Sequence, residues 1–296
     1  MWRAALEAAE LTRRLVLPIV VSDAVEDREA VEGTGALERI SITEAVREAR
    51  SAAAAGIAGL LVYGATERRD ETALLASQRD HVVARAVRAL KDAVPDLAVA
   101  TDVCVCAYTT HGQCVLFHEG AADIDGTLAR LEEIAVVHAE AGADLLIPSG
   151  MLDGTVAALR AALAGEHDVL PVAAVVQVES GLDGLHRIAV GATGISERAV
   201  PLIDPSDRGA AQARVERDLA AGADAVVVKP ALTTLDLVAA LAASTDAPVI
   251  AHHTADEHAL FTAESDADGR GAERETLAAS LRAGARILIS YGALTI

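Results

Sequence analysis

Aromatic residues are scarce in this chain. Phe, Trp and Tyr together make up 2% of its 296 residues, whereas hydrophobic residues as a whole reach 52%. The chain can therefore bury a large core, but that core has to be built from Val, Ile, Leu and Ala. The length allows one large domain of the α/β barrel kind or two smaller domains.

Basic residues are also in short supply. The 25 Lys and Arg residues face 44 Asp and Glu residues, which gives a formal net charge of −19. A nucleic-acid-binding protein needs a basic face, so we expect no nucleic-acid partner. No run of 18 apolar residues is present, and the first residues, MWRAALEAAELTRRL, lack the apolar core of a secretory signal. We therefore predict a cytoplasmic protein that acts on a small molecule and does not enter a membrane.

Cysteine is limited to three residues, Cys104, Cys106 and Cys114. An odd, clustered set of this kind is not a disulfide framework and indicates reduced thiols. Their C-x-C-x7-C spacing follows an apolar run at 97–101, so the three sulfurs can converge on one soft metal ion. Three protein ligands with a fourth position left open are typical of a catalytic zinc. We predict Zn²⁺ here; three small buried residues without a metal are the alternative.

One pattern recurs along the chain: an Ala-rich helical segment, a Gly near its end and a short β-branched run. AEAGADLLIPSG and LAAGADAVVVKP are two examples. The Gly suits the left-handed residue that ends a helix, and nearly continuous apolar runs are typical of parallel strands covered on both faces. The expected strands are 15–21, 58–64, 97–103, 143–148, 171–177, 223–229, 247–252 and 285–291.

Helical patterns fill most of the gaps between these strands. The expected helices are 41–55, 70–93, 125–141, 153–164, 206–221, 233–243 and 256–283. Strands and helices that alternate over this length predict a (β/α)8 TIM barrel formed by a single domain, residues 1–296. A doubly wound open sheet is the alternative, although no G-x-G-x-x-G follows the first strand.

Three segments fall outside this alternation. Residues 1–14 are expected to form a short N-terminal arm, and residues 22–40 a polar loop. Residues 178–205 carry four glycines and are predicted to form a lid over the C-terminal face of the barrel. A mobile surface loop is the alternative for this last segment.

Active-site residues of TIM barrels lie at the C-terminal ends of the strands. The polar residues at the predicted ends are Tyr63, Asp102, Cys104, Ser149, Lys229, His252, His253 and Tyr291. Lys229 follows three valines, and its removal from water favours a neutral amine that can attack a ketone or aldehyde and form a Schiff base. A lysine that reaches solvent or binds a phosphate or carboxylate is the alternative.

The segment TDVCVCAYTTHGQC, followed later by VVVKPALTTLDLV, resembles porphobilinogen synthase, the 5-aminolevulinate dehydratase of tetrapyrrole synthesis. The likeness spans most of the chain and includes LIDPSDR and the final LISYG. The resemblance implies a (β/α)8 barrel, usually octameric, that condenses two 5-aminolevulinate molecules to a pyrrole.

The same resemblance implies roles for individual residues. It makes the three cysteines the ligands of a catalytic zinc, with Asp102 beside them as a catalytic residue. It makes Lys229 the Schiff-base lysine for the first-bound substrate and Tyr291 a ligand of that substrate's carboxylate. It makes Arg187 and Arg198 the lid residues that bind the carboxylate of the second substrate.

The chain departs from the family pattern at several positions. The family has a second active-site lysine on the fifth strand, where PVAAVVQVES places Gln177 or Val178. The only lysines of the chain are Lys91 and Lys229. On the seventh strand, His252 and His253 replace a tyrosine and an asparagine.

These departures predict a diverged, zinc-dependent Schiff-base lyase that condenses or dehydrates 5-aminolevulinate or a related amino ketone or keto acid. Ser149, His252 and His253 are then expected to contact the substrate or to act as acid–base groups. Three alternatives stay open: a genuine porphobilinogen synthase, a class I aldolase-like lyase, and an inactive homologue with a binding or structural role. A homo-oligomer is expected, although the short N-terminal arm leaves the octamer open.

Overall fold

A closed ring of parallel strands forms the centre of the molecule. The computed structural model describes residues 5, 10–34, 37–193, 197–262 and 267–296. Its barrel strands are β1 (Leu15–Ser22), β4 (Gly59–Ala65), β5 (Ala98–Asp102), β8 (Leu145–Ile147), β9 (Ala173–Gln177), β10 (Ala225–Lys229), β11 (Val249–His252) and β12 (Ile287–Ile289). They pair in the order β8-β5-β4-β1-β12-β11-β10-β9, and a parallel bridge between Leu146 and Val172 nearly closes the ring. The predicted TIM barrel is confirmed.

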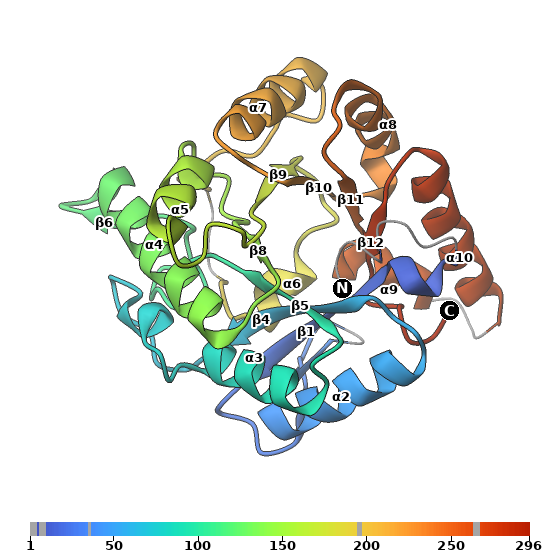
Figure 1. The fold of residues 1–296 in the computed structure, drawn as a ribbon, viewed down its shortest axis with the longest axis horizontal. Helices are drawn as coiled ribbons and strands as arrows, with labels where there is room; N and C mark the ends of the chain where they lie inside the picture. The colour runs from blue at the N-terminus through green and yellow to red at the C-terminus, as the bar shows by residue number, and fades with distance from the viewer. Residues whose placement is uncertain (1–4, 6–9, 35–36, 194–196, 263–266) are drawn as a thin grey trace.

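Helices surround this ring (Figure 1). They are α2 (Ile42–Ala54), α3 (Val82–Ala93), α4 (Ile124–Ala141), α5 (Thr155–Leu163), α7 (Arg208–Ala220), α8 (Leu235–Ser244), α9 (Ala255–Thr262) and α10 (Ala267–Arg282). Every residue of β1, β4, β9 and β10 is buried, because the strands are covered by helices outside and by side chains inside. Ser41 caps α2, since its hydroxyl accepts a hydrogen bond from the backbone N–H of Glu44.

Two predicted helices were wrong in their extent. The helix expected at 70–93 begins only at Val82, because Asp70 accepts hydrogen bonds from the N–H groups of Thr72 and Leu74 and thereby forms a turn. The helix expected at 256–283 is two helices, α9 and α10, and residues 263–266 between them lie outside the described residues.

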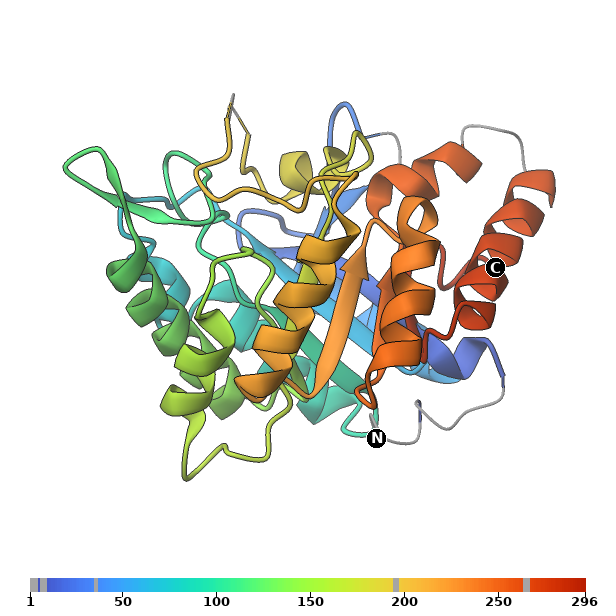
Figure 2. The same cartoon turned by 90° about the horizontal axis from the view of Figure 1, so that it is seen from above.

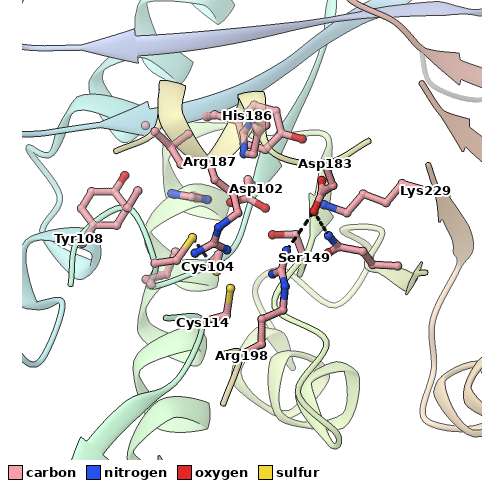
Figure 3. Close-up of a pocket in the computed structure, with 18 residues that line it drawn as sticks. Asp102, Cys104, Tyr108, Cys114, Ser149, Asp183, His186, Arg187, Arg198 and Lys229 are labelled. Carbon is pink, nitrogen blue, oxygen red and sulfur yellow. Dashed lines mark hydrogen bonds and ion pairs between the residues drawn. The ribbon is translucent and has the colours of Figure 1, made fainter. Parts of the chain in front are cut away.

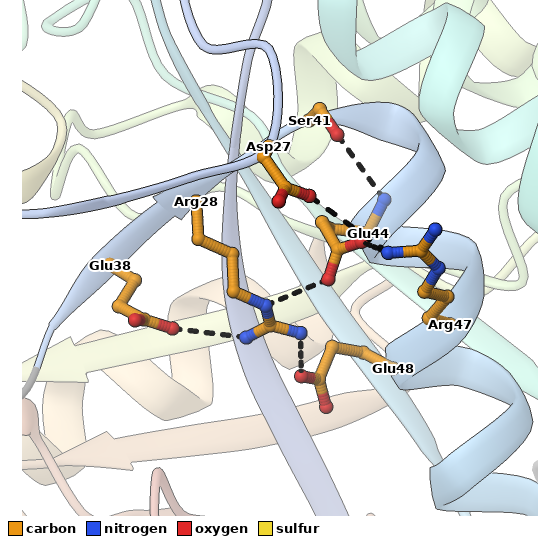
Figure 4. Close-up of polar contacts among 7 residues, drawn as sticks. All are labelled: Asp27, Arg28, Glu38, Ser41, Glu44, Arg47 and Glu48. Atoms are coloured by element: carbon orange, nitrogen blue, oxygen red, sulfur yellow. Dashed lines mark hydrogen bonds and ion pairs between the residues drawn. The ribbon is translucent and has the colours of Figure 1, made fainter.

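The predicted polar loop at 22–40 contains a small hairpin. Strands β2 (Arg28–Ala30) and β3 (Glu38–Ile40) pair antiparallel, and β3 also pairs in parallel with the end of β1. Figure 4 shows why this segment is so polar: Arg28 donates to Glu44 at 2.8 Å and to Glu38 at 3.0 Å, and it also contacts Glu48. These ion pairs fasten the hairpin to α2.

Part of the predicted lid segment crosses the C-terminal end of the barrel. Its short helix α6 (Leu185–Ala189) lies above the strand ends in Figure 2. The two ends of the segment are joined, since Ile203 donates to the carbonyl of Gln177 at 3.0 Å and Glu179 donates to the carbonyl of Ile203 at 2.8 Å. Residues 194–196 of this segment, and residues 1–4 and 6–9 of the expected N-terminal arm, lie outside the described residues.

None of the described helices combines the length and apolarity needed to cross a bilayer.

Candidate active site

A pocket lies at the C-terminal ends of the strands, beneath the lid segment (Figure 3). Eight residues expected at the site from the sequence line it: Asp102, Cys104, Cys106, Cys114, Ser149, Arg187, Arg198 and Lys229. Tyr63, Gln177, Asp183 and His186 also line it. In Figure 3 the thiols and Lys229 lie on opposite sides of the pocket, with Asp102 and Ser149 between them.

The three cysteines converge. Their sulfur atoms all lie within 4.8 Å of one another, and those of Cys104 and Cys106 are 3.4 Å apart. Hydrogen bonds from the two other thiols hold the pKa of Cys114 well below its usual range, and the positive charges of Arg187 and Arg198 act in the same direction. Three thiols gathered in this way fit one soft metal ion that keeps an open coordination position.

The loop after β8 packs directly against this cluster. A Cβ atom at Gly150 would lie 3.3 Å from the Cβ of Cys114 and 3.7 Å from the sulfur of Cys104. A side chain at Gly150 would therefore crowd the cysteine cluster.

Asp102 ends β5 and lies between the three cysteines and Lys229 (Figure 3). Burial raises its pKa to about 6, while a hydrogen bond from Ser149 and the charge of Lys229 oppose that shift. Its Oδ1 atom is buried and has no hydrogen-bond partner among the described residues. Because buried polar atoms are rarely left without a partner, this oxygen is suited to accept a hydrogen bond from a bound molecule.

Lys229 ends β10 and is 7% exposed. In the pairing of β9 with β10 it lies opposite Gln177, whose amide donates to the carboxylate of Asp183. The other lysine of the chain, Lys91, pairs with Asp144 at 2.8 Å, outside this pocket. Lys229 is therefore the one amine side chain available to a ligand in the pocket.

The two arginines of the lid segment both line the pocket, but they have different hydrogen-bond partners. Arg187 donates to the carbonyl of Gly112 at 3.1 Å, which holds α6 against the cysteine loop. Arg198 pairs with Asp183 at 3.3 Å. Gln113 adds a further link, because its amide donates to the carbonyl of Glu197 at 2.7 Å.

The remaining predicted residues lie behind the pocket wall. The hydroxyl of Tyr291 is 3.3 Å from Nδ1 of His186, which itself lines the pocket. Burial lowers the pKa of His252 well below its usual range, and the nearby charges of Lys229 and His186 lower it further. The ring of His253 instead contacts the hydroxyl of Ser280 on α10 at 2.9 Å, so the structure does not bring it to the pocket.

Four pocket residues with polar side chains were missed in the sequence: Tyr108, His138, Asp183 and His186. The last two lie in the segment 178–205, which has no helical or strand periodicity that could orient a side chain. The prediction of a lid was the only signal that pointed to this part of the chain.

Comparisons with known proteins agree with this geometry. The sequence model of the family described as delta-aminolevulinic acid dehydratase matches residues 1–296. The delta-aminolevulinic acid dehydratase of Escherichia coli (strain K12) is 37% identical over 285 residues, which cover 95% of this chain and 88% of that protein. The enzyme of the same name from Mycobacterium tuberculosis (strain H37Rv) is 36% identical over 292 residues, covering 95% of this chain and 88% of its own length.

A solved structure shares the whole architecture. It is the delta-aminolevulinic acid dehydratase of Toxoplasma gondii ME49 in complex with the reaction product porphobilinogen. The TM-score is 0.90 at 28% sequence identity, and the match covers 97% of this chain and 84% of that one.

Proposed function

Because the chain belongs to the delta-aminolevulinic acid dehydratase family, we propose that it is a lyase that condenses two 5-aminolevulinate molecules to porphobilinogen. The observation that supports this most directly is that Lys229 and the three thiols open on one pocket. The relatives carry the name of the family's own reaction, and they favour it over the specialised reaction that the sequence suggested.

Lys229 is the proposed nucleophile. Its neutral amine attacks the ketone carbon of the first substrate, a C–N bond forms and the carbonyl C–O bond breaks. The oxygen leaves as water with the two amine protons, and the substrate remains attached as a Schiff base. Asp102, whose buried Oδ1 lacks a partner among the described residues, is placed to accept a hydrogen bond from the substrate's amino group.

The carboxylates of the substrates need cationic or hydrogen-bonding partners. Arg187 and Arg198 line the pocket from the lid segment and suit the carboxylate of the second substrate. Tyr291 is proposed for the carboxylate end of the first substrate, with Ser149 as a further polar contact.

The cysteine cluster is the proposed zinc site. Cys104, Cys106 and Cys114 would hold the ion, and zinc bound there acts as a Lewis acid that polarises a substrate carbonyl. The close sulfurs of Cys104 and Cys106, and the absence of a side chain at Gly150 beside the cluster, fit that role.

One observation favours a second candidate function. Gln177, an amide, lies opposite Lys229 and donates to Asp183, so the described pocket offers one amine instead of two. An enzyme with one Schiff base would attach a first amino ketone covalently and condense it with a different, non-covalently bound partner.

Incubation of the purified, zinc-loaded protein with 5-aminolevulinate alone tests the two candidates. Formation of porphobilinogen, measured by the absorbance of a coloured derivative, supports the dehydratase. A borohydride-trapped adduct without porphobilinogen supports the second candidate. Neither product nor adduct would contradict both.

The lysine assignment has its own test. The variant Lys229→Met should lose the trapped adduct and at least about 10³-fold in turnover, because covalent catalysis fails when its nucleophile is removed. Lys91→Met is the matched control, since Lys91 pairs with Asp144 outside the pocket. Peptide mapping of the borohydride adduct identifies the modified lysine; an adduct on Lys91 would contradict the assignment.

A further inference from the structure

His186 occupies a position in the pocket that the mechanism above does not use. It lies on α6 and lines the pocket together with Lys229. Its ring lies against that of Tyr63, with the ring centroids 4.2 Å apart and the planes inclined by 56°. Its Nδ1 atom is 3.3 Å from the hydroxyl of Tyr291.

These contacts join three elements that are distant in the sequence. Tyr63 belongs to β4, His186 to the lid segment, and Tyr291 follows β12. The aromatic contact holds the plane of the imidazole, and the phenol binds one of its two nitrogens. These two contacts fix the orientation of the imidazole ring, which a side chain that only filled space would not need.

The imidazole is neutral at physiological pH. Burial lowers the pKa of His186 to about 3, and the charges of Lys229 and Arg187 act in the same direction, against Cys114.

We propose that His186 moves protons between Lys229 and the oxygen of the first substrate while the Schiff base forms, and that Tyr291 orients its ring. This proposal rests on the function proposed above, and it adds the group that handles the protons of that step. The attacking amine must lose two protons, and the carbonyl oxygen must gain two to leave as water. The ring nitrogen of His186 that does not contact Tyr291 takes each proton in turn from the nitrogen of Lys229 and gives it to the oxygen, first to form the hydroxyl of the carbinolamine and then to release that hydroxyl as water. No proton is gained or lost overall, and no oxidant is needed.

The test is the rate of Schiff-base formation, measured separately from its extent. Zinc-loaded protein is mixed with 5-aminolevulinate, quenched with borohydride at increasing times and weighed by intact mass spectrometry. His186→Phe keeps an aromatic ring against Tyr63 but removes both nitrogens. We expect the rate constant to fall by about 10²-fold, as is typical for loss of a general acid–base group, with the final adduct fraction unchanged.

Further variants separate proton transfer from a structural role. At saturating 5-aminolevulinate, Tyr291→Phe should slow the step less than His186→Phe does, because it removes the group that orients the imidazole and leaves the imidazole itself in place. In His186→Ala, added imidazole should restore part of the rate. His118→Phe, an exposed position on β6 (Leu116–His118), is the matched control and should react as the wild type does.

The pH profile of the rate provides a further readout. The titratable or charged groups near His186 are Lys229, Arg187, His252, Cys114, Tyr63 and Tyr291. Because His186 stays neutral well above pH 3, His186→Phe should lower the rate by a similar factor at every pH from 6 to 9, whereas His118→Phe should not lower it.

Each result decides the proposal. A wild-type rate in His186→Phe, or a lower final adduct fraction at an unchanged rate, would overturn the role of His186 and leave the proposed function standing. Failure of imidazole to restore any rate in His186→Ala would also count against proton transfer. Absence of any adduct in the wild-type protein would overturn the proposed function and this inference together.

Discussion

At the scale of single residues, Cys114 carries the negative charge of the thiol cluster. Cys104 and Cys106 hydrogen-bond to its sulfur, and both lid arginines favour its ionised form. The neighbouring thiols and burial raise the pKa of Cys104 well above its usual range. Three thiolates could share this space only with a cation between them, so the cluster suits the metal ion proposed above.

Cys114→Ser should therefore release zinc. We expect the zinc affinity to fall by more than about 100-fold, since changes to groups that only orient metal ligands already cost 10–100-fold. Mass-spectrometric metal analysis after dialysis against a weak chelator measures the loss. Asp102→Asn is the control: it should keep its zinc but lose turnover, and retention of full zinc by Cys114→Ser would exclude the site.

Residues in motifs could be predicted from the sequence, and residues placed by packing could not. The three cysteines and Lys229 lie at or just after the ends of strands whose apolar runs are clear in the sequence. The barrel fold alone therefore brings them to the same end of the barrel. His186 depends on contacts with Tyr63 and Tyr291, which no local pattern encodes. Both His252 and His253 were expected at the pocket, but adjacent side chains on an extended backbone point to opposite faces, and the ring of His253 contacts Ser280 on α10.

At the scale of elements, α6 is a helix that cannot be stable alone, because it has only five residues. Charged side chains from other elements hold both of its ends. Asp256 on α9 accepts a hydrogen bond from the N–H of Leu185 at 3.0 Å. Arg39 on β3 donates to the carbonyl of Ala189 at 2.7 Å, and Arg69 donates to that of Val190 at 3.1 Å.

These contacts place an acid at the start of α6 and two cations at its end, as the helix dipole favours. The β2–β3 hairpin contributes to these contacts, because Arg39 lies on it. The sequence did not reveal the hairpin, since its three-residue strands show no clear alternation of apolar and polar residues. They also explain how His186 and Arg187 stay directed at the pocket.

Removal of both arginine contacts should loosen the lid segment. We expect Arg39→Ala combined with Arg69→Ala to raise KM roughly ten-fold, the equivalent of about one charge-assisted hydrogen bond, with a smaller effect on kcat. Hydrogen exchange of the amides at 185–193 should accelerate. Arg68→Ala, at the exposed neighbouring position, should change neither quantity, and unchanged exchange in the double variant would show that other contacts hold α6.

At the scale of the whole molecule, the barrel was predictable because each strand that is buried on both faces is a nearly continuous apolar run. The homo-oligomer stays a prediction from the resemblance. At the wall of the pocket, however, the core contains a pair of histidines that the sequence did not suggest, and one of them, His138, lines the pocket. His81 on the N-terminal side of α3 stacks on His138 of α4, with ring centroids 5.4 Å apart and planes inclined by 15°.

Both histidines are nearly inaccessible, with 2% and 1% of their surfaces exposed. Neither nitrogen of His81, nor Nε2 of His138, has a hydrogen-bond partner among the described residues. Burial lowers the pKa of His81 to about 4, with the charge of Arg88 adding to it. Burial also lowers the pKa of His138 well below its usual range, and His81 acts in the same direction. The fold therefore requires two neutral imidazoles side by side.

This requirement makes the stability of the barrel depend on pH. The unfolded chain binds protons at these histidines near pH 6.5, whereas folded His81 does so only near pH 4. The contribution of the neutral pair is thus complete above pH 6.5 and is lost as the pH falls from 6.5 towards 4. At pH 5 His81 should cost about 2 kcal/mol of unfolding free energy relative to pH 7.5, and His138 should add to this loss in the same direction.

Urea unfolding of the wild type and of His81→Phe at pH 7.5 and pH 5 measures how the contribution of His81 to the unfolding free energy depends on pH. Buried groups that do not contact His81 titrate equally in both proteins, so the difference between their losses reports His81 together with its effect on His138. Phe fills the same space against Tyr108 and His138 and takes up no proton, and its neighbour His138 then lacks the repulsion of a second imidazolium. The variant should therefore lose at least about 2 kcal/mol less than the wild type between the two pH values. His118→Phe, on the exposed hairpin strand β6, should follow the wild type; equal losses in all three proteins would mean that His81 is solvated in the folded state.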